Sequence, residues 1–451
     1  MSDFSHHLSP EPRILADGHF ADNHSGTMMA HEKYRWWVRL LLVLGWCFMG
    51  FNVLYADNGR RVVAVTMSET SVPWYSDKWR YWQFNHHQPV HKDANGRRDI
   101  GSNYYPAIGL FDDSDPEYIE YACQLLAMAE VDAITAHHND SFKNEWHNQA
   151  ARKWFPILKR YGLKDAPRGG GDGGAMVLEK DYKLFQPDIL TISNRGVYVF
   201  FSIKMPDADI AAWKNTYPAD QRPFIIRVFE ATGRKVGASI DGAYGWVAHD
   251  TKKKNDNSRP GYVWANDAEQ AKSGYENEVA RARRYIADGE LHWYADGVSP
   301  GFNDQAVNGW GGGPRYIERA NGETYRYRWQ RACENGFPAV FIPTWDDWGE
   351  GSMIAPTVEF GNQYLEITRT YAAKYKGIPP NHGNFDVPKW IYTIRKRTDD
   401  PQILTAMKQA CDLMQQRKYA EAEAFVLPYV KALQITSLPT YWEWTAQHRV
   451  K

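Results

Sequence analysis

This sequence lacks several features that mark well-known classes of protein. Its formal net charge is −1, so no excess of positive charge indicates a nucleic-acid partner. No glycine-rich phosphate-binding fingerprint follows the first predicted strand, and "RGGGDGGA" at 168–175 lacks the lysine of a P-loop. We interpret that segment as a flexible loop. No nucleotide site and no cofactor are therefore predicted.

Cysteine is also scarce, and no metal site is evident. None of the four cysteines shows metal-ligand spacing, and all but Cys47 fall in helix-like patterns, so free buried thiols are expected, with one disulfide as the alternative. Histidine pairs occur at 86–87 and 137–138, but no carboxylate spacing accompanies them. We predict no metal. The cysteines are Cys47, Cys123, Cys333 and Cys411.

Long apolar runs are rare, and the one at the N-terminus resembles a targeting signal. Lys33, Arg35 and Arg39 precede an apolar stretch from Leu40 to about Ala56. That stretch is short for a transmembrane helix and suits a signal peptide or a signal anchor. The sequence therefore predicts that the rest of the chain is exported, in periplasmic, secreted or membrane-anchored form, with a possible membrane tether.

Aromatic residues, in contrast, are abundant. The chain has 19 Trp and 27 Tyr, and many of them adjoin Gly, Asn or Asp. Flat apolar rings edged by polar groups suit sugars, whose C–H faces stack on the rings while their hydroxyl groups form hydrogen bonds. We therefore expect a carbohydrate ligand. The alternative is a set of large loops that use the aromatic residues only for packing.

Strand and helix patterns alternate over roughly 300 residues. "RRVVAVTM" at 60–67 predicts a first strand, and Asp115 followed by Pro116 predicts the N-terminus of a helix. Further strands are predicted at 131–136, 197–203, 236–246, 292–304 and 339–345, with helices between them. This alternation predicts a parallel sheet, either open and doubly wound or closed as a (β/α)₈ TIM-like barrel. We favour the barrel.

The character of the sequence changes after Tyr375. Residues 399–433 predict two amphipathic helices, which we interpret as one hairpin packed on the barrel. The predicted domains are an N-terminal extension with the signal or anchor at 1–56, a catalytic barrel at 57–376 and a C-terminal helical extension at 377–451.

The segment "FIPTWDDWGEG" at 341–351 is the strongest candidate for chemistry. On a barrel it lies at the C-terminal end of the last strand, on the face where active sites gather. Asp347 and Glu350 are three residues apart, so both can point into one pocket and act as the carboxylate pair of glycoside cleavage. Trp345 and Trp348 would supply apolar walls that raise a carboxyl pKa. The alternative is a solvated acidic turn that caps the next helix.

Four segments resemble glycoside hydrolases of families 71 and 99, in the same order along the chain. They are "VPWYS" at 72–76, "NYYPAIGLFDDSDPEYIEYACQLLAMAEVDAI" at 103–134, "SPGFNDQAVNGWGGGPRYIERANGETY" at 299–325, and "AVFIPTWDDWGEGSMIAPTVEFGNQYLEI" at 339–367. The resemblance implies a (β/α)₈ barrel that acts on α-linked polysaccharide or glycan. It implies Glu350 as the acid/base and Asp347 as the second carboxylate, which in family 99 is thought to deprotonate the sugar 2-hydroxyl.

The sequence also departs from that pattern. Asp346 stands where the families usually have Asn, and Ala355 stands where Glu commonly precedes Pro-Thr. The families' substrate is therefore not transferred to this chain. Beyond the carboxylate pair, the residues expected to contact substrate are Trp345, Trp348, Asp346, Tyr105, Asp241, Tyr244, Asn303, Trp310 and Arg315.

The leading hypothesis is an exported glycoside hydrolase. Two alternatives remain open: a non-catalytic carbohydrate-binding barrel, which the departures at Asp346 and Ala355 allow, and a glycosyl-transfer role in surface polysaccharide assembly. The absence of a nucleotide-sugar site or basic cluster in the sequence argues against the second alternative.

Overall fold

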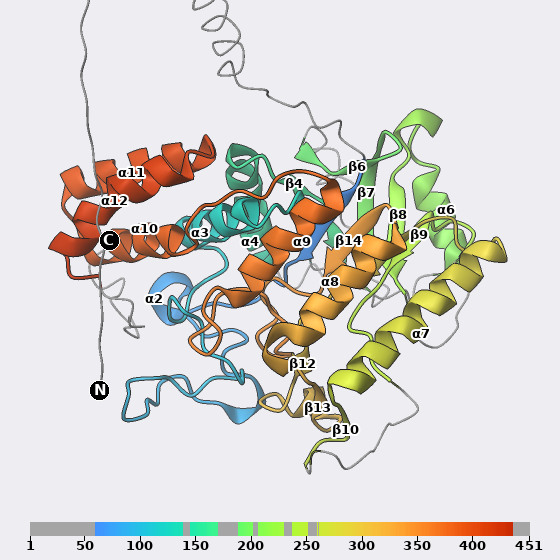
Figure 1. The fold of residues 1–451 in the computed structure, drawn as a ribbon, viewed down its shortest axis with the longest axis horizontal. Helices are drawn as coiled ribbons and strands as arrows, with labels where there is room; N and C mark the ends of the chain where they lie inside the picture. The colour runs from blue at the N-terminus through green and yellow to red at the C-terminus, as the bar shows by residue number, and fades with distance from the viewer. Residues whose placement is uncertain are drawn as a thin grey trace, which may run out of the picture. The chain divides into compact units, whose positions relative to one another are not determined.

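The computed structural model describes residues 59–138, 145–169, 188–201, 206–229, 237–250, 259 and 261–435 (Figure 1). All of them belong to one compact unit that spans residues 57–451. The predicted extension and targeting segment at 1–56 lie outside the described residues, and the targeting role stays a prediction. Within the ranges given above, no helix is both long and apolar enough to cross a membrane.

Parallel strands form the centre of this unit. They are β1 (Arg61–Val65), β2 (Ala133–Thr135), β3 (His137–His138), β4 (Lys164–Asp165), β5 (Arg168–Gly169), β7 (Arg195–Phe200), β8 (Phe224–Val228), β9 (Gly242–Tyr244), β11 (Tyr294–Gly297) and β14 (Ala339–Ile342). They pair in the order β3-β5-β7-β8-β9-β11-β14-β1-β2-β4. Because β2 and β3 are halves of one strand position, as are β4 and β5, the path returns to its start. The sheet is a TIM-like barrel and not an open doubly wound sheet.

Alternation along the strands explains how the barrel is filled. Val63 and Val65 of β1 belong to an interior apolar cluster with Val199 of β7 and Phe341 of β14. The intervening residue Ala64 belongs instead to a cluster that includes helical residues outside the ring. Successive side chains of a strand point to opposite faces, so continuous apolar strands are buried on both sides.

Helices connect the strands and cover the barrel (Figure 1). Helix α3 begins after Asp115, whose carboxylate accepts from the Glu117 N–H at 2.9 Å, as the sequence predicted. Helix α7 begins with a capping box between Asp267 and Gln270. The connecting helices are α3 (Pro116–Met128), α4 (Glu145–Arg160), α6 (Asp207–Lys214), α7 (Ala268–Ala287), α8 (Glu323–Asn335) and α9 (Gln363–Lys376).

Three C-terminal helices, α10 (Asp386–Arg397), α11 (Pro401–Gln415) and α12 (Tyr419–Ala432), follow the barrel. Helices α11 and α12 are the predicted hairpin, and α10 joins it to α3. Arg395 of α10 pairs with Glu120 of α3 at 2.6 Å, and Lys396 pairs with Asp115 at 2.5 Å. Because Glu120 and Asp115 are buried, these ion pairs tie the C-terminal helices to the barrel.

The remaining elements are short. A small sheet of β10 (Trp264–Asn266), β13 (Arg315–Ile317) and β12 (Phe302–Asn303) lies beside the barrel, and β6 (Thr191–Ile192) pairs with β7. Short helices are α2 (Pro73–Ser76), η1 (Phe84–His86), η3 (Ala219–Gln221), η5 (Asn308–Gly311) and η6 (Ala320–Gly322). The three cysteines among the described residues, Cys123, Cys333 and Cys411, are free thiols, as expected.

The structure corrects the prediction of a flexible loop starting at Arg168. Arg168 and Gly169 form β5, which pairs with β3 and β7, while the rest of that segment lies outside the described residues. The glycine-rich composition after Gly169 masked a short strand that only pairing with its neighbours stabilises. Strand β8 and helix α4 were also missed, and α4 carries Pro156 inside it.

Candidate active site

The loop at 343–351, which follows β14, is held by hydrogen bonds to its neighbours. The Trp345 N–H donates to the carbonyl of Val65 at the end of β1 (2.7 Å). The Asp347 N–H donates to the Thr344 hydroxyl (2.9 Å), which closes a tight turn. Since the C-terminal ends of barrel strands share one face, the loop carries its acidic side chains to the face where barrel enzymes hold their active sites.

Two glycines allow other segments to approach this loop closely. A Cβ on Gly349 would lie 3.0 Å from the Trp310 ring and 3.1 Å from the Tyr81 ring. Gly351 has φ +57°, and a Cβ there would lie 2.6 Å from the Asn303 carbonyl oxygen. Side chains at these positions would push the aromatic residues away from the carboxylates. The glycines of the motif are therefore required by the geometry of the site.

Asp347 is almost fully buried, with 1% of its surface exposed. Its Oδ1 accepts from the Tyr81 hydroxyl at 3.1 Å and from the Glu350 N–H at 2.9 Å. Burial raises the pKa of Asp347 to about 7; the charge of Glu69 also raises this pKa, and the hydrogen bonds and the charge of Arg168 lower it. The hydrogen bonds and Arg168 thus offset only part of the effect of burial.

Glu350 has a different environment. Its Oε1 accepts from the Trp310 indole N–H at 3.3 Å and lies 3.7 Å from the Arg315 guanidinium. Its Oε2 is buried without a hydrogen-bond partner among the described residues. Burial and the charge of Asp347 raise the pKa of Glu350 well above its usual value, while Arg315 lowers it. Glu350 therefore tends to hold a proton.

The two carboxyl groups therefore differ in their hydrogen-bond partners. Asp347 accepts two short hydrogen bonds, whereas Glu350 has only weak donors and one unpaired oxygen. Two neighbouring acids with opposed environments are the arrangement that assigns one as the base or nucleophile and the other as the acid. This pair can perform acid-assisted displacement at a sugar carbon.

A third carboxyl group, that of Asp346, lies against the end of β1. Its Oδ1 accepts from the Met67 N–H at 2.7 Å, and only 3% of its surface is exposed. Burial raises its pKa well above the usual value, and the nearby charge of Asp113 raises it further. Asp346 therefore supports the strand end and tends to be protonated. Its predicted contact with substrate stays a prediction.

Replacing Asp346 with asparagine should stabilise the protein at neutral pH. The pKa of the Asp346 carboxyl is higher in the folded than in the unfolded protein, so the free energy of unfolding falls as pH rises from the unfolded-state pKa to the folded-state pKa. Asparagine does not ionise, so the variant escapes this loss of stability. We expect the melting temperature of Asp346→Asn to exceed that of wild type by about 1–3 °C at pH 8, with the gap closing near pH 4. Calorimetry across pH checks this. A gap that does not change with pH would contradict it.

Arg168 is a site residue that sequence reasoning did not select. It begins β5, is 1% exposed, and donates to the Thr66 carbonyl at 3.0 Å. No carboxylate lies within ion-pair distance of it among the described residues, and its Nε is buried without a partner. A buried cation of this kind acts through its field, which lowers the pKa of Asp347. The sequence offered no signal for it, because the segment that begins at Arg168 was predicted to be a loop.

Removing the charge of Arg168 should move the pH dependence of activity. Without it the pKa of Asp347 rises further, so the acidic limb of kcat/KM should shift to higher pH in Arg168→Met. Arg168→Lys keeps the charge and should recover part of the shift. Rates from pH 4 to 9 test this, with melting curves as a control for folding. If the acidic limb of kcat/KM falls at the same pH in Arg168→Met, Arg168→Lys and wild type, Arg168 contributes to packing alone.

Tyr81 and Phe84 were also missed, although both lie in an aromatic stretch that the sequence made conspicuous. Tyr81 donates to Asp347, and its ring lies 5.5 Å from that of Trp310. Phe84 packs against Trp310 at 4.5 Å. Phe84 is 42% exposed and Trp310 is 36% exposed. The indole of Trp310 thus joins Glu350 to an exposed aromatic surface.

Trp345 and Trp348 lie elsewhere than expected. They are 0% and 1% exposed and belong to the main apolar core, where Trp348 packs against Trp82 and Phe111. Neither indole has exposed surface for a sugar ring to contact. Their burial does provide the apolar surroundings that raise the carboxyl pKa values.

The other predicted residues from the loops fall close to Glu350. The Asn303 N–H donates to the Glu350 carbonyl at 2.8 Å. Arg315 forms a close ion pair with buried Asp304 (2.6 Å) and extends from it toward Glu350. Tyr105 lines a neighbouring cavity. Their contact with substrate stays a prediction.

Asp241 and Tyr244 do not end a strand together, which corrects the sequence interpretation. Strand β9 begins at Gly242, so Asp241 lies at its N-terminal end, away from the catalytic face. There Asp241 pairs with Arg195 (2.9 Å) and Lys214 (2.6 Å). Tyr244 is 0% exposed and stacks on Phe341 inside the barrel. The ion pairs fully occupy Asp241, which therefore has a structural role.

The alternative of an acidic cap for the next helix does not fit the structure. Helix α9 begins at Gln363, and its N-cap residue is Asn362. Asp346 and Asp347 bond to the end of β1 and to their own loop, and both are buried. The segment is not a solvated turn.

No group of three or more His, Cys, Asp or Glu side chains in the described part of the chain is arranged to hold a metal ion. His87 is bonded to Asp99 at 2.5 Å. His137 and His138 form β3.

Comparisons with known proteins agree with the fold. No protein-family model and no curated protein matches the sequence. Among solved structures, the chain is similar to the GH99 endo-alpha-mannosidase from Bacteroides thetaiotaomicron, with a TM-score of 0.55 and 17% identity over 70% of this chain and 98% of that one. The same enzyme in complex with bis-tris propane gives a TM-score of 0.54 and 17% identity over 70% and 97% of the two chains. The chain therefore shares the barrel fold of that solved structure.

Proposed function

We propose that this protein is a glycoside hydrolase that cleaves α-linked polysaccharide or glycan. The observation that carries the proposal is the pair of buried carboxyl groups of Asp347 and Glu350 on the loop after β14. Their hydrogen-bonding environments differ in the sense that a base and an acid require. The fold is consistent with this activity, and the similar solved structure is described as an endo-alpha-mannosidase.

In the proposed reaction, Glu350 donates its proton to the glycosidic oxygen as the bond to the leaving sugar breaks. Asp347 either attacks the anomeric carbon and forms a glycosyl ester, or takes the proton of the sugar 2-hydroxyl while O2 attacks the anomeric carbon and forms a 1,2-anhydro sugar; Tyr81 and the Glu350 N–H hold Asp347 in place. Water then completes hydrolysis, with Glu350 as the base. Both routes predict a first product of retained configuration, which NMR can read; an inverted product would instead assign Asp347 as the base that activates a water molecule for direct attack.

A screen of the purified protein against α-mannans, α-glucans and related glycans tests this proposal. We expect reducing ends to be released from at least one polymer by wild type and not by Glu350→Gln. Release by both proteins would point to a contaminating enzyme. Binding of a polymer without release by wild type would favour a non-catalytic carbohydrate-binding barrel instead.

We further propose that the chain is exported, with the apolar stretch at 40–56 as a signal peptide or membrane tether. Residues 28–60, fused to a reporter that is active only outside the cytoplasm, should produce reporter signal. Changing Leu42 and Leu44 to Arg should abolish it, because charges disrupt an apolar targeting core. A signal that survives this change, or none from the native segment, would refute export by this route.

A further inference from the structure

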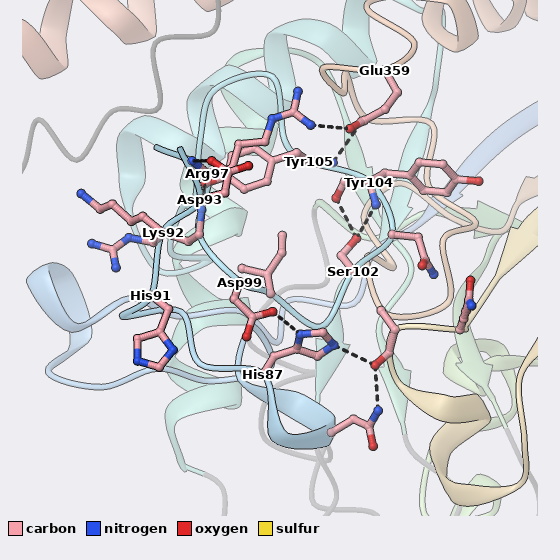
Figure 2. Close-up of a pocket in the computed structure, with 16 residues that line it drawn as sticks. His87, His91, Lys92, Asp93, Arg97, Asp99, Ser102, Tyr104, Tyr105 and Glu359 are labelled. Carbon is pink, nitrogen blue, oxygen red and sulfur yellow. Dashed lines mark hydrogen bonds and ion pairs between the residues drawn. The ribbon is translucent and has the colours of Figure 1, made fainter. Parts of the chain in front are cut away.

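A cavity of about 960 Å³, whose lining residues are drawn in Figure 2, lies beside the carboxylate loop: a Cβ on Gly351 of that loop would lie 3.0 Å from the ring of Tyr104, which lines the cavity. Its walls come from the loop between η1 and α3, from the turn after β12 and from Glu359, all of them described residues. None of these lining residues belongs to the carboxylate pair. The volume is in the range of sites that enclose small organic ligands.

Two series of contacts, or routes, connect the residues that line the cavity to Glu350. The Asn103 amide donates to the Asn303 carbonyl at 2.9 Å, and the Asn303 N–H donates to the Glu350 carbonyl at 2.8 Å. On the other route, Trp310 donates to Glu350 and packs on Phe84, which directly precedes the lining residue Asn85. The exposed rings of Phe84 and Trp310 therefore lie between the acid and the cavity.

The carboxylates of the cavity are already occupied by donors. Asp99 accepts from the His87 ring at 2.5 Å and from a backbone N–H at 3.0 Å. Figure 2 shows the His87 imidazole beside Asp99, and its other nitrogen bonds to the Ala306 carbonyl. Glu359 accepts from the Tyr105 N–H and pairs with Arg97 at 3.5 Å.

The permanent charges of the lining also balance. Three cations face three carboxylates, so neither sign of ligand is favoured. The members are Lys92, Arg97, Arg98, Asp93, Asp99 and Glu359.

The amide side chains leave polar groups available for a ligand. Asn85 donates to the Ala306 carbonyl, and Gln305 accepts from the Tyr262 hydroxyl. Among the described residues, the side-chain carbonyl oxygens of Asn85 and Asn103 and the side-chain NH₂ group of Gln305 have no hydrogen-bond partner. Amides with a spare donor or acceptor, next to the rings of Tyr104 and Tyr105, match the hydroxyl groups and C–H faces of a neutral sugar.

We propose that this cavity binds further neutral sugar residues of the glycan, on the leaving-group side of the bond that Glu350 helps to cleave. The inference rests on the proposed function for the identity of the chain that enters it. The side is inferred from Trp310, because its indole donates to the carboxyl group of Glu350, which protonates the oxygen that departs with the leaving sugar.

Ala306→Trp tests this by filling the cavity. Only the methyl group of Ala306 is replaced, and its carbonyl contacts with Asn85 and His87 can persist. Ala94→Trp is the matched control, because Ala94 is exposed and does not line the cavity. Two substrates are compared, both with the linkage found in the screen: an aryl glycoside and an oligosaccharide with three sugars on the leaving side.

We expect Ala306→Trp to lower kcat/KM on the oligosaccharide at least about tenfold and to leave the aryl glycoside within about twofold, since remote binding energy is lost only where remote sugars exist. Asn85→Gly should give a smaller loss in the same sense. Asn85 has φ 55°, which glycine adopts readily, so this variant keeps the backbone. Asn194→Gly, at φ 60° in the β6–β7 hairpin, is its control.

The outcomes separate this inference from the proposed function. Equal rates for Ala306→Trp and wild type on both substrates would overturn the inference and leave the hydrolase standing. If wild type cleaves no glycan, saturation-transfer NMR with neutral α-mannotetraose and α-glucotetraose still tests the cavity. Binding that Ala306→Trp abolishes and Ala94→Trp retains supports it. Binding by neither wild type nor variants, or only of uronic-acid oligosaccharides, refutes it.

Discussion

Glu350→Gln should lower kcat on an α-linked oligosaccharide by about 10²–10⁴-fold without unfolding the protein. Glutamine keeps the size of the side chain and can still accept from the Trp310 indole, but it carries no proton for the leaving oxygen. Burial and the charge of Asp347 raise the pKa of Glu350, which favours the protonated form that the proposed acid needs. Initial rates with melting curves measure the effect, and Glu366→Gln, on the exposed face of α9, is the control.

The leaving group provides a second measurement of the same role. The dinitrophenolate of a dinitrophenyl glycoside is a leaving group that needs no protonation. Glu350→Gln should therefore lose far less activity on this substrate than on an oligosaccharide. An equal loss on both substrates would assign Glu350 to another step. Wild-type activity on both would remove it from the mechanism.

Asp347→Asn should cost about 10³-fold or more in kcat on both substrates, because a base or nucleophile is needed whatever the leaving group. Asparagine can still accept from Tyr81 and from the Glu350 N–H, so the loop should keep its shape. Asp296→Asn is the matched control, since Asp296 is also a buried aspartate but accepts from the Asn335 amide, outside the carboxylate loop. Its activity should stay near that of wild type.

Azide separates the two roles open to Asp347. If Asp347 attacks the anomeric carbon, azide should restore turnover of the aryl substrate and yield a glycosyl azide of inverted configuration. If it deprotonates the 2-hydroxyl, azide at the anomeric carbon should not replace it. Activity of Asp347→Asn within a few-fold of wild type would exclude both roles.

The barrel and its loop could be predicted because their signals are local. Apolar runs, the Asp115–Pro116 helix start and the glycines beside three carboxylates all act through neighbouring residues. Strand pairing, helix α3 and the C-terminal hairpin agree with those predictions. Strand β5 escaped because it has two residues and depends on pairing across the barrel, whereas β8 is a mostly apolar run of five residues that was overlooked.

The surroundings of the carboxylates depend on residues distant in the chain. Tyr81 and Arg168 converge on Asp347, and Trp310 converges on Glu350, from different barrel loops. Contacts with residues distant in the chain also explain why Trp345 and Trp348 are buried in the core. Asp241 lies at the N-terminal end of its strand, opposite the catalytic face. A residue type and its spacing do not specify which side of a loop faces the core.

By itself, the sequence determined most of the alternation of strands and helices and the position of two carboxyl groups after the last strand. Hydrophobic periodicity and turn chemistry suffice for these, because they depend on residues within a few positions of one another. Only the tertiary structure decided which carboxyl group gathers hydrogen bonds and which keeps an unpaired oxygen. Burial, pKa and the cavity beside Glu350 arise from segments that meet only when the barrel closes.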